Sequence, residues 1–168
     1  IPMALAYLGL DPSSTDRADY KKAEEMLLKV RPYIKTFDNY AYQKMPEREF
    51  CVAVTWGPDG LLAVSGAEEA DTGVELKFFS PPGKGKANIW VDGWVIPADA
   101  ENVEEAHLFL DYMMRPQVGA NDSNWTWYAT ANQTALDEGL IDEAVTSSIA
   151  AFPPAELVAE MYPLSVVP

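Results

Sequence analysis

The chain has 168 residues, and 12 basic against 26 acidic residues give it a formal net charge of −14 at pH 7. A field of that sign repels phosphate backbones and anionic lipid surfaces and attracts cations, which excludes nucleic acid as a partner class. An apolar content of 48% excludes global disorder, and the length suits one domain or slightly more. A simpler interpretation, that the acidity only keeps the protein soluble, stays open.

Cysteine and histidine occur once each, as Cys51 and His107. One cysteine cannot close an internal disulfide, and the two residues are too few for a Cys/His metal site. We therefore expect no metal and no cofactor, and we place His107 on a helix surface and not in a catalytic pair. No apolar run approaches the roughly 18 residues that a membrane span needs. The chain begins at Ile1 without a signal peptide, which indicates a processed or truncated piece.

The first third of the chain predicts helices followed by strands. The stretch "IPMALAYLGL" is typical of a helix that stops at Gly9. Apolar residues at helical spacing predict a one-sided helix over 19–31, ended by Pro32. Residues 33–37, "YIKTF", predict a short strand, and "NYAYQKMPEREF" a short helix. The continuous apolar run at 50–55 predicts a strand buried on both faces.

Strands and helices alternate through the middle of the chain. Pro58 suits the first turn of a helix, and residues 73–79, "GVELKFF", alternate like a strand. Residues 89–97 are expected to be extended, and a helix is expected over 103–114. The remainder mixes short helices and loops. This alternation predicts the α/β class with partly parallel strand pairing.

Trp90 and Asp92 stand two residues apart in the extended stretch "IWVDGWVIP". In a strand this spacing puts both side chains on one face, where an indole and a carboxylate meet the same cation. Asp-Gly between apolar residues is also the strongest short hairpin signal, so Asp92 and Gly93 suit a turn equally well. The residues alone leave both interpretations open.

Trp56 and Asp59 follow the predicted strand at 50–55. Ligand crevices in open α/β sheets lie beyond the carboxyl ends of the strands, which is where this Trp-Gly-Pro-Asp turn is expected. The alternative is that Trp56 belongs to the core and that Asp59 only complements the helix dipole, a contribution of about 0.3 to 1 kcal/mol.

The loop "NWTWYATAN" carries Trp125, Trp127 and Tyr128 close together. Such a loop is either the wall of a site or a plug over a core, and the sequence does not separate the two. The rings of Trp56, Trp90 and Tyr128 and the two aspartates together form an apolar and anionic set. A cation–π contact contributes about 0.5 to 2 kcal/mol and a charge-assisted hydrogen bond about 1.5 to 3 kcal/mol. The set therefore selects ammonium groups carried on a short aliphatic stem.

Long ordered stretches of the chain resemble the polyamine-binding (putrescine/spermidine) periplasmic proteins of bacterial ABC transporters. These stretches are "LLKVRPYIKTF", "CVAVTWGPDG", "IWVDGWVIPADAENVEEAHLFLDYMMRPQV" and "WYATAN". The resemblance implies a non-enzymatic receptor with the α/β type II periplasmic solute-binding fold, in which two lobes close over a polyamine in the cleft between them. It also implies that the ligand is bound by Trp56, Asp59, Trp90, Asp92 and Tyr128.

The resemblance covers only the second half of such a protein. We therefore expect residues 1–168 to be the C-terminal portion of a bilobal protein, with roughly 1–80 mostly in one lobe, roughly 86–135 mostly in the other, and roughly 136–168 returning. The expected partners are a small polyamine, the permease in the inner membrane and the missing N-terminal half of the same protein. The expected location is the periplasm.

Two other classes of protein stay open. As a glycoside hydrolase or a sugar-binding protein, the chain would use Asp59 and Asp92 as acid and base and its tryptophans to stack sugar rings. As an interaction module, it would use the aromatic loop as an exposed patch. Diamine binding without turnover, release of reducing sugar, and self-association that ignores both ligands distinguish the three classes.

Overall fold

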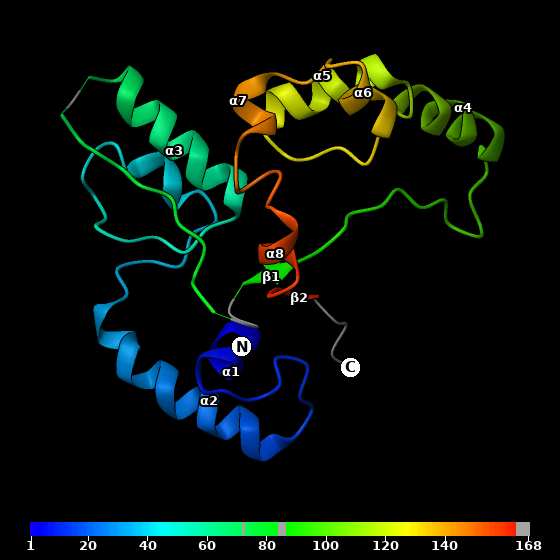
Figure 1. Cartoon of the computed structure of the whole chain (residues 1–168). Helices are drawn as coiled ribbons and strands as arrows, with labels where there is room; N and C mark the ends of the chain where they lie inside the picture. The colour runs from blue at the N-terminus through cyan, green and yellow to red at the C-terminus, as the bar shows by residue number, and fades with distance from the viewer. Residues whose placement is uncertain (72, 84–86, 164–168) are drawn as a thin grey trace. The chain divides into compact units, whose positions relative to one another are not determined.

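The computed structural model describes residues 1–71, 73–83 and 87–163, which are rich in helix and contain a short parallel strand pair (Figure 1). None of the helices in these residues has the length and apolarity to cross a membrane. The elements are α1 (Pro2–Tyr7), α2 (Arg17–Val30), η1 (Arg31–Tyr33), η2 (Ala41–Lys44), α3 (Gly57–Glu69), β1 (Asn88–Ile89), α4 (Val103–Met113), α5 (Pro116–Thr126), α6 (Gln133–Asp137), α7 (Glu143–Thr146), α8 (Ala155–Val158) and β2 (Tyr162–Pro163).

The chain divides into two compact units, and each is described by itself. Unit 1 comprises Ile1–Trp56, Gly60–Trp90 and Pro154–Pro168. Unit 2 comprises Gly57–Asp59 and Val91–Pro153. Helix α3 therefore contributes its first three residues to unit 2 and the rest to unit 1.

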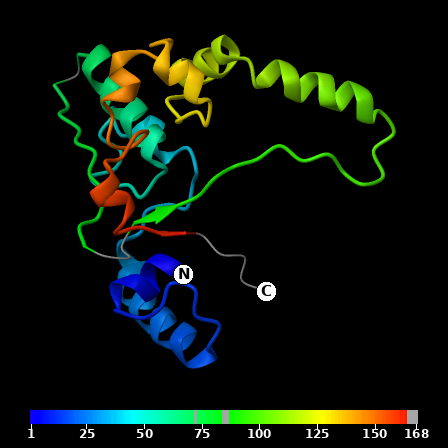
Figure 2. The same cartoon turned by 45° about the vertical axis from the view of Figure 1, so that its right-hand side comes forward.

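One core of unit 1 lies between α1 and α2, which are side by side in both views (Figures 1 and 2). Leu5 is 1% exposed and Ala23 is fully buried, and Leu10 and Met26 pack against them. Helix α1 ends just before Gly9, whose φ of +73° lies in the left-handed region that glycine adopts without strain. The predicted helix end at Gly9 is confirmed.

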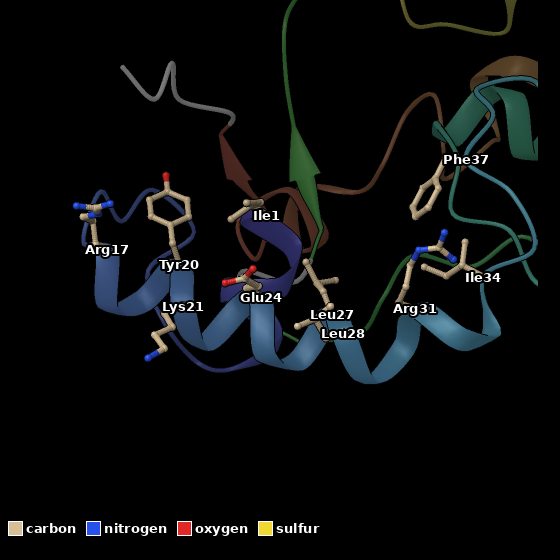
Figure 3. Close-up of a pocket in the computed structure, with 10 residues that line it drawn as sticks. All are labelled: Ile1, Arg17, Tyr20, Lys21, Glu24, Leu27, Leu28, Arg31, Ile34 and Phe37. Atoms are coloured by element: carbon tan, nitrogen blue, oxygen red, sulfur yellow. The ribbon is translucent and has the colours of Figure 1, made fainter.

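Helix α2 confirms the one-sided helix predicted over 19–31 and begins two residues earlier. The Asp16 side chain caps it by accepting a hydrogen bond of 2.8 Å from the Ala18 N–H. The apolar stripe on this helix is only partly covered, because Leu27 and Val30 are exposed. A helix whose apolar face remains in water needs a further partner or leaves a surface groove, and an open groove runs along this face of α2 (Figure 3).

Three predicted strands are wrong for the part of the chain that the structure describes. The segments 33–37, 50–55 and 73–79 contain no hydrogen-bonded strand. Residues 50–55 are not buried on both faces, since Val52 is 79% and Val54 81% exposed. A strand forms only where a neighbour satisfies its backbone N–H and C=O groups, and no described segment pairs with these three.

The parallel pairing that we predicted is found between β1 and β2, over two residues of each strand. Asn88 pairs with Tyr162 and Ile89 with Pro163, and the Tyr162 N–H donates to the Ala87 carbonyl at 3.0 Å. The described α/β character therefore consists of this one pair among many helices, and it is much smaller than the predicted alternation of strands and helices.

The hairpin interpretation of Asp92 and Gly93 is wrong. A two-residue hairpin turn needs a positive φ at its first central residue or at both central residues, and neither Asp92 nor Gly93 has one. No turn or bend is found from Trp90 to Ile96.

The core of unit 2 is built from α5, α6 and α7, which gather in both views (Figures 1 and 2). Ala120 of α5, Ala135 of α6 and Val145 of α7 are buried together, and the small alanines allow the helices to approach closely. Helix α4 confirms the helix predicted over 103–114, and the short helix predicted in "NYAYQKMPEREF" is found as η2.

Truncation of Leu5 tests the first core. We expect Leu5→Ala to lower the free energy of unfolding by about 2 to 5 kcal/mol, because it removes a fully buried side chain and leaves a cavity. Tyr7→Ala, an exposed position on the same helix, is the matched control, with an effect within about 0.5 kcal/mol. Chemical unfolding followed by circular dichroism measures both, and equal effects of the two variants would contradict this packing.

Candidate functional site

The rings of Trp56 and Trp90 contact each other in unit 1, although 33 residues separate them in the chain. Their ring centroids lie 4.7 Å apart, and the planes are tilted by 58°. This is within the range of favourable aromatic pairs. Trp56 is 46% exposed, so it is not the core residue of the alternative interpretation, and its ring keeps surface for a ligand. The structure brings these two predicted site residues together.

The beginning of α3 fixes the backbone of Trp56. Trp56 is the N-cap residue with extended φ and ψ, Pro58 lies in the first turn, and the Gly60 N–H donates to the Trp56 carbonyl at 3.1 Å. A Cβ at position 60 would lie 2.7 Å from Cδ2 of Phe78, so any larger residue there would displace the Phe78 ring. The tight approach of Phe78 thus holds the first turn of α3 and the tryptophan before it.

Asp59 lies in the first turn of α3, in unit 2, and is half-buried. Loss of water around its carboxylate raises the pKa of Asp59 above the usual range. Among the described residues, no side chain or backbone N–H donates a hydrogen bond to this carboxylate and no basic group pairs with it. The described residues therefore provide no counter-charge for Asp59.

Asp92 and Tyr128 also belong to unit 2. Asp92 is exposed in the extended segment that follows β1. Tyr128 is half-buried after the end of α5, and its position is set by two hydrogen bonds. Its carbonyl accepts from the buried hydroxyl of Ser123, and its N–H donates to the Thr126 hydroxyl at 3.3 Å.

The aromatic loop has one of the two roles that we left open, because one of its rings plugs a core. Trp127 packs against the core of unit 2 and takes a left-handed φ of 63°, which ends α5. Trp125 is 85% exposed and covers no core. Asn132 secures the loop, because its side-chain amide donates to the Met114 carbonyl at 2.6 Å. The loop therefore plugs a core with one ring and presents Tyr128 on a hydrogen-bonded backbone.

Two features of unit 2 escaped the sequence analysis. Ser123 is a buried polar residue whose hydroxyl donates to the Tyr128 carbonyl. No pattern in the neighbouring sequence indicates that this serine is buried. Trp94 and Phe109 form an edge-to-face pair with centroids 5.3 Å apart, and both are exposed. The alternation in "IWVDGWVIP" is a signal that could have drawn attention to Trp94.

No three His, Cys, Asp or Glu side chains of the described residues are placed to hold a metal ion. Unit 1 offers two contacting indoles, whose faces suit an organic cation with an apolar stem. Unit 2 offers the half-buried carboxylate of Asp59, the exposed carboxylate of Asp92 and the phenol of Tyr128.

The bacterial extracellular solute-binding protein family matches residues 1–153. The chain belongs to this family. It is 38% identical over 164 residues to the putrescine-binding periplasmic protein PotF of Escherichia coli, covering 96% of this chain and 43% of that protein. It is 34% identical to the putrescine/agmatine-binding protein of Pseudomonas aeruginosa, covering 100% of this chain and 45% of the relative.

A third similar protein is the spermidine/putrescine-binding periplasmic protein 1 of Haemophilus influenzae, at 30% identity over 93% of this chain and 41% of the relative. The resemblance to polyamine-binding periplasmic proteins is confirmed by these matches. The chain spans less than half the length of the curated relatives that it matches.

Substitution of Ser123 tests how Tyr128 is held. We expect Ser123→Ala to lower the free energy of unfolding by about 1 to 3 kcal/mol, because the Tyr128 carbonyl loses its buried donor. Ser147→Ala, at an exposed serine of the same unit, is the matched control and should leave stability within about 0.5 kcal/mol. Thermal unfolding followed by circular dichroism compares them, and an unaltered Ser123→Ala protein would contradict the assigned hydrogen bond.

Proposed function

We propose that the full-length protein is a polyamine receptor, which captures a putrescine-like cation in the periplasm and delivers it to the permease of an ABC transporter. The contact between the rings of Trp56 and Trp90 carries this proposal. It joins two of the five residues that were expected to bind the ligand and leaves ring surface accessible. The relatives named for putrescine or spermidine support the same ligand class.

A diamine needs an apolar wall for its methylene stem and an anion for each ammonium group. The indoles of Trp56 and Trp90 provide the wall, and cation–π attraction adds about 0.5 to 2 kcal/mol per ring. Asp59 and Asp92 provide negative charge, and Tyr128 a further aromatic surface. Burial raises the pKa of the Asp59 carboxyl, and a bound ammonium group would favour its ionised form.

The magnitude of binding indicates that this chain supplies only part of the site. Micromolar affinity requires about −8 kcal/mol, and ligand efficiency limits a diamine of about six heavy atoms to roughly −9 kcal/mol. Nearly every contact must therefore be favourable. We propose that the type II bilobal fold is completed by the remainder of the protein. In that fold roughly 1–80 would lie mostly in one lobe, 86–135 mostly in the other, and 136–168 would return.

A hydrolase is not favoured. The family is one of solute-binding proteins, which supports our proposal that Asp59 and Asp92 bind a ligand and do not act as acid and base. Release of reducing sugar from a glycan by the purified protein would reverse that assignment.

Substitution of Asp92 tests the proposed anchor in the full-length protein. We expect Asp92→Asn to weaken putrescine binding tenfold or more, at least about 1.4 kcal/mol, because an ammonium group loses its counter-charge. Isothermal titration with putrescine measures this effect. Asp99→Asn, an exposed aspartate of the same stretch, is the matched control and should bind as the unaltered protein does. Equal affinity of Asp92→Asn and the control would contradict the assignment.

The pH dependence of binding tests Asp59. Its pKa is raised by burial, so as pH falls the carboxylate is protonated sooner than an ordinary aspartate. Putrescine affinity should therefore decline as pH falls through that raised pKa, and Asp59→Asn should bind weakly with no such decline. A decline of the same size in Asp59→Asn would contradict the role of this residue.

The raised pKa of Asp59 also makes the free energy of unfolding of the unliganded protein depend on pH. Stability should fall as pH rises, whereas putrescine affinity should increase. A carboxyl group whose folded pKa is raised contributes stability at low pH that is lost as pH rises through the folded pKa. Asp59→Asn should therefore unfold at a higher denaturant concentration than the unaltered protein at neutral pH. The difference should shrink in acid.

A further inference from the structure

The beginning of α3 lies against a turn of unit 2 that is distant in the sequence. Gly57 belongs to unit 2, and so does Ala150 in that turn. A Cβ at position 57 would lie 3.0 Å from the Ala150 Cβ, 3.2 Å from its carbonyl oxygen and 3.4 Å from its Cα. Three atoms of one residue thus border the place where a side chain would begin. The absence of a side chain at Gly57 allows this close approach of the two backbones.

The turn that contains Ala150 has little freedom to move away. The Ala150 N–H donates to the Ser148 hydroxyl at 3.2 Å, and the Phe152 N–H donates to the Ser148 carbonyl at 2.8 Å. Ala151 is 8% exposed and belongs to the core of unit 2, against which Phe152 also packs. Displacement of Ala150 would therefore disturb hydrogen bonds on one side of it and core packing on the other.

A side chain at position 57 would therefore displace the start of α3. Contacts of 3.0 to 3.4 Å are tighter than a Cβ normally makes, so one side must give by a few tenths of an ångström. The start of α3 is the more weakly held side, because its N-cap residue Trp56 makes no side-chain hydrogen bond to it and its contact at Gly60 is to the ring of Phe78. Asp59 lies in this first turn. A displaced turn moves its carboxylate.

The core that holds the Ala150 turn also supports another residue of the proposed ligand site. Trp127 packs against the buried cluster that contains Ala151, and Tyr128 follows Trp127 directly. Asp59 is connected to the same cluster through the contact at Gly57. Two residues of the proposed site in unit 2 thus take their positions from one core.

We infer that Gly57 is a positioning residue for Asp59, because its contact with Ala150 fixes the carboxylate relative to the core of unit 2. The effect on polyamine affinity rests on the proposed function, in which Asp59 binds an ammonium group. A binding group has to be held within about 0.5 Å of its productive position, and the displacement caused by one added Cβ approaches that value. Gly57 offers no side chain to a ligand, so it acts through the residues that it positions.

The carboxyl carbon signal of Asp59 in nuclear magnetic resonance of the unliganded full-length protein reports this positioning. Asp59→Asn identifies the signal by its loss. Gly57→Ala should move the signal, and Ala150→Val, which adds bulk from the opposite side of the contact, should also move it. Gly66→Ala is the matched control on the same helix and should leave the signal in place, because its Cβ would come no closer than 3.9 Å, to Cγ of Pro46. An unmoved signal in Gly57→Ala and Ala150→Val overturns the inference.

Putrescine affinity, measured by isothermal titration, tests what the positioning does. Gly57→Ala should weaken binding about fivefold or more, and Gly66→Ala less than about twofold. In an Ala150→Gly background, which lacks the Cβ at 3.0 Å, the same substitution should cost clearly less. In an Asp59→Asn background it should cost less than about twofold, because the carboxylate that it displaces is already absent. An undiminished loss in either background overturns the inference, since general damage to the structure would act equally in all of them.

The two measurements separate this inference from the proposed function. A shifted Asp59 signal with unchanged putrescine affinity contradicts the ligand role of Asp59 and supports its positioning by Gly57. An unmoved signal, together with weak binding by Asp59→Asn, supports the ligand role and overturns the positioning. Thermal unfolding of each variant establishes that it is folded at the temperature of the titration.

Discussion

The contact between Trp56 and Trp90 connects parts of unit 1 that are distant in the sequence. Trp56 caps α3, and Trp90 directly follows β1, whose partner is β2 near the other end of the described chain. The ring pair therefore holds the start of a helix against the end of a parallel strand. Each side is independently constrained, by Gly60 against Phe78 on one and by the ladder at Asn88 on the other. The positions of the two indole rings therefore depend on both of these constraints.

The distribution of charge gives the chain two distinct chemistries. Twelve of the charged residues of unit 2 are acidic, and one of them, Asp59, is a half-buried carboxylate with no counter-charge among the described residues. Such a group is costly in the unliganded protein and is most useful when the ligand is a cation. The cations of α2 lie in unit 1, beside apolar side chains that remain in water. The first feature supports the proposed receptor for organic cations.

Local signals predicted the helices well and non-local contacts poorly. The ends of α1 and α2 follow from Gly9, Asp16 and the spacing of apolar residues, all of which act within a few residues. The run at 50–55 has strand composition, but a strand also needs a neighbour, and no described segment pairs with it. The Asp92-Gly93 signal was misleading for the same reason, because a hairpin needs a returning strand as well as a turn.

The candidate site was predicted in part. Trp56 and Trp90 were selected because each follows a strand-like run, yet their ring contact depends on packing around α3 that composition does not reveal. The support of Tyr128 by Ser123 could not be predicted, because a serine hydroxyl satisfies a buried carbonyl only after the turn at Trp127 is formed. The acids were recognised by residue type alone, and the burial that distinguishes Asp59 appears only in the fold.

Nuclear magnetic resonance of the tryptophan indole N–H groups tests the central claim most directly. This chain contributes five tryptophans to the full-length protein, and single substitutions assign their indole signals, which are then followed as putrescine is added. The account predicts that the signals of Trp56 and Trp90 shift together along one titration curve while that of the exposed Trp125 stays in place. Unmoved signals of Trp56 and Trp90 at saturating putrescine, or an equal shift of Trp125, would contradict it.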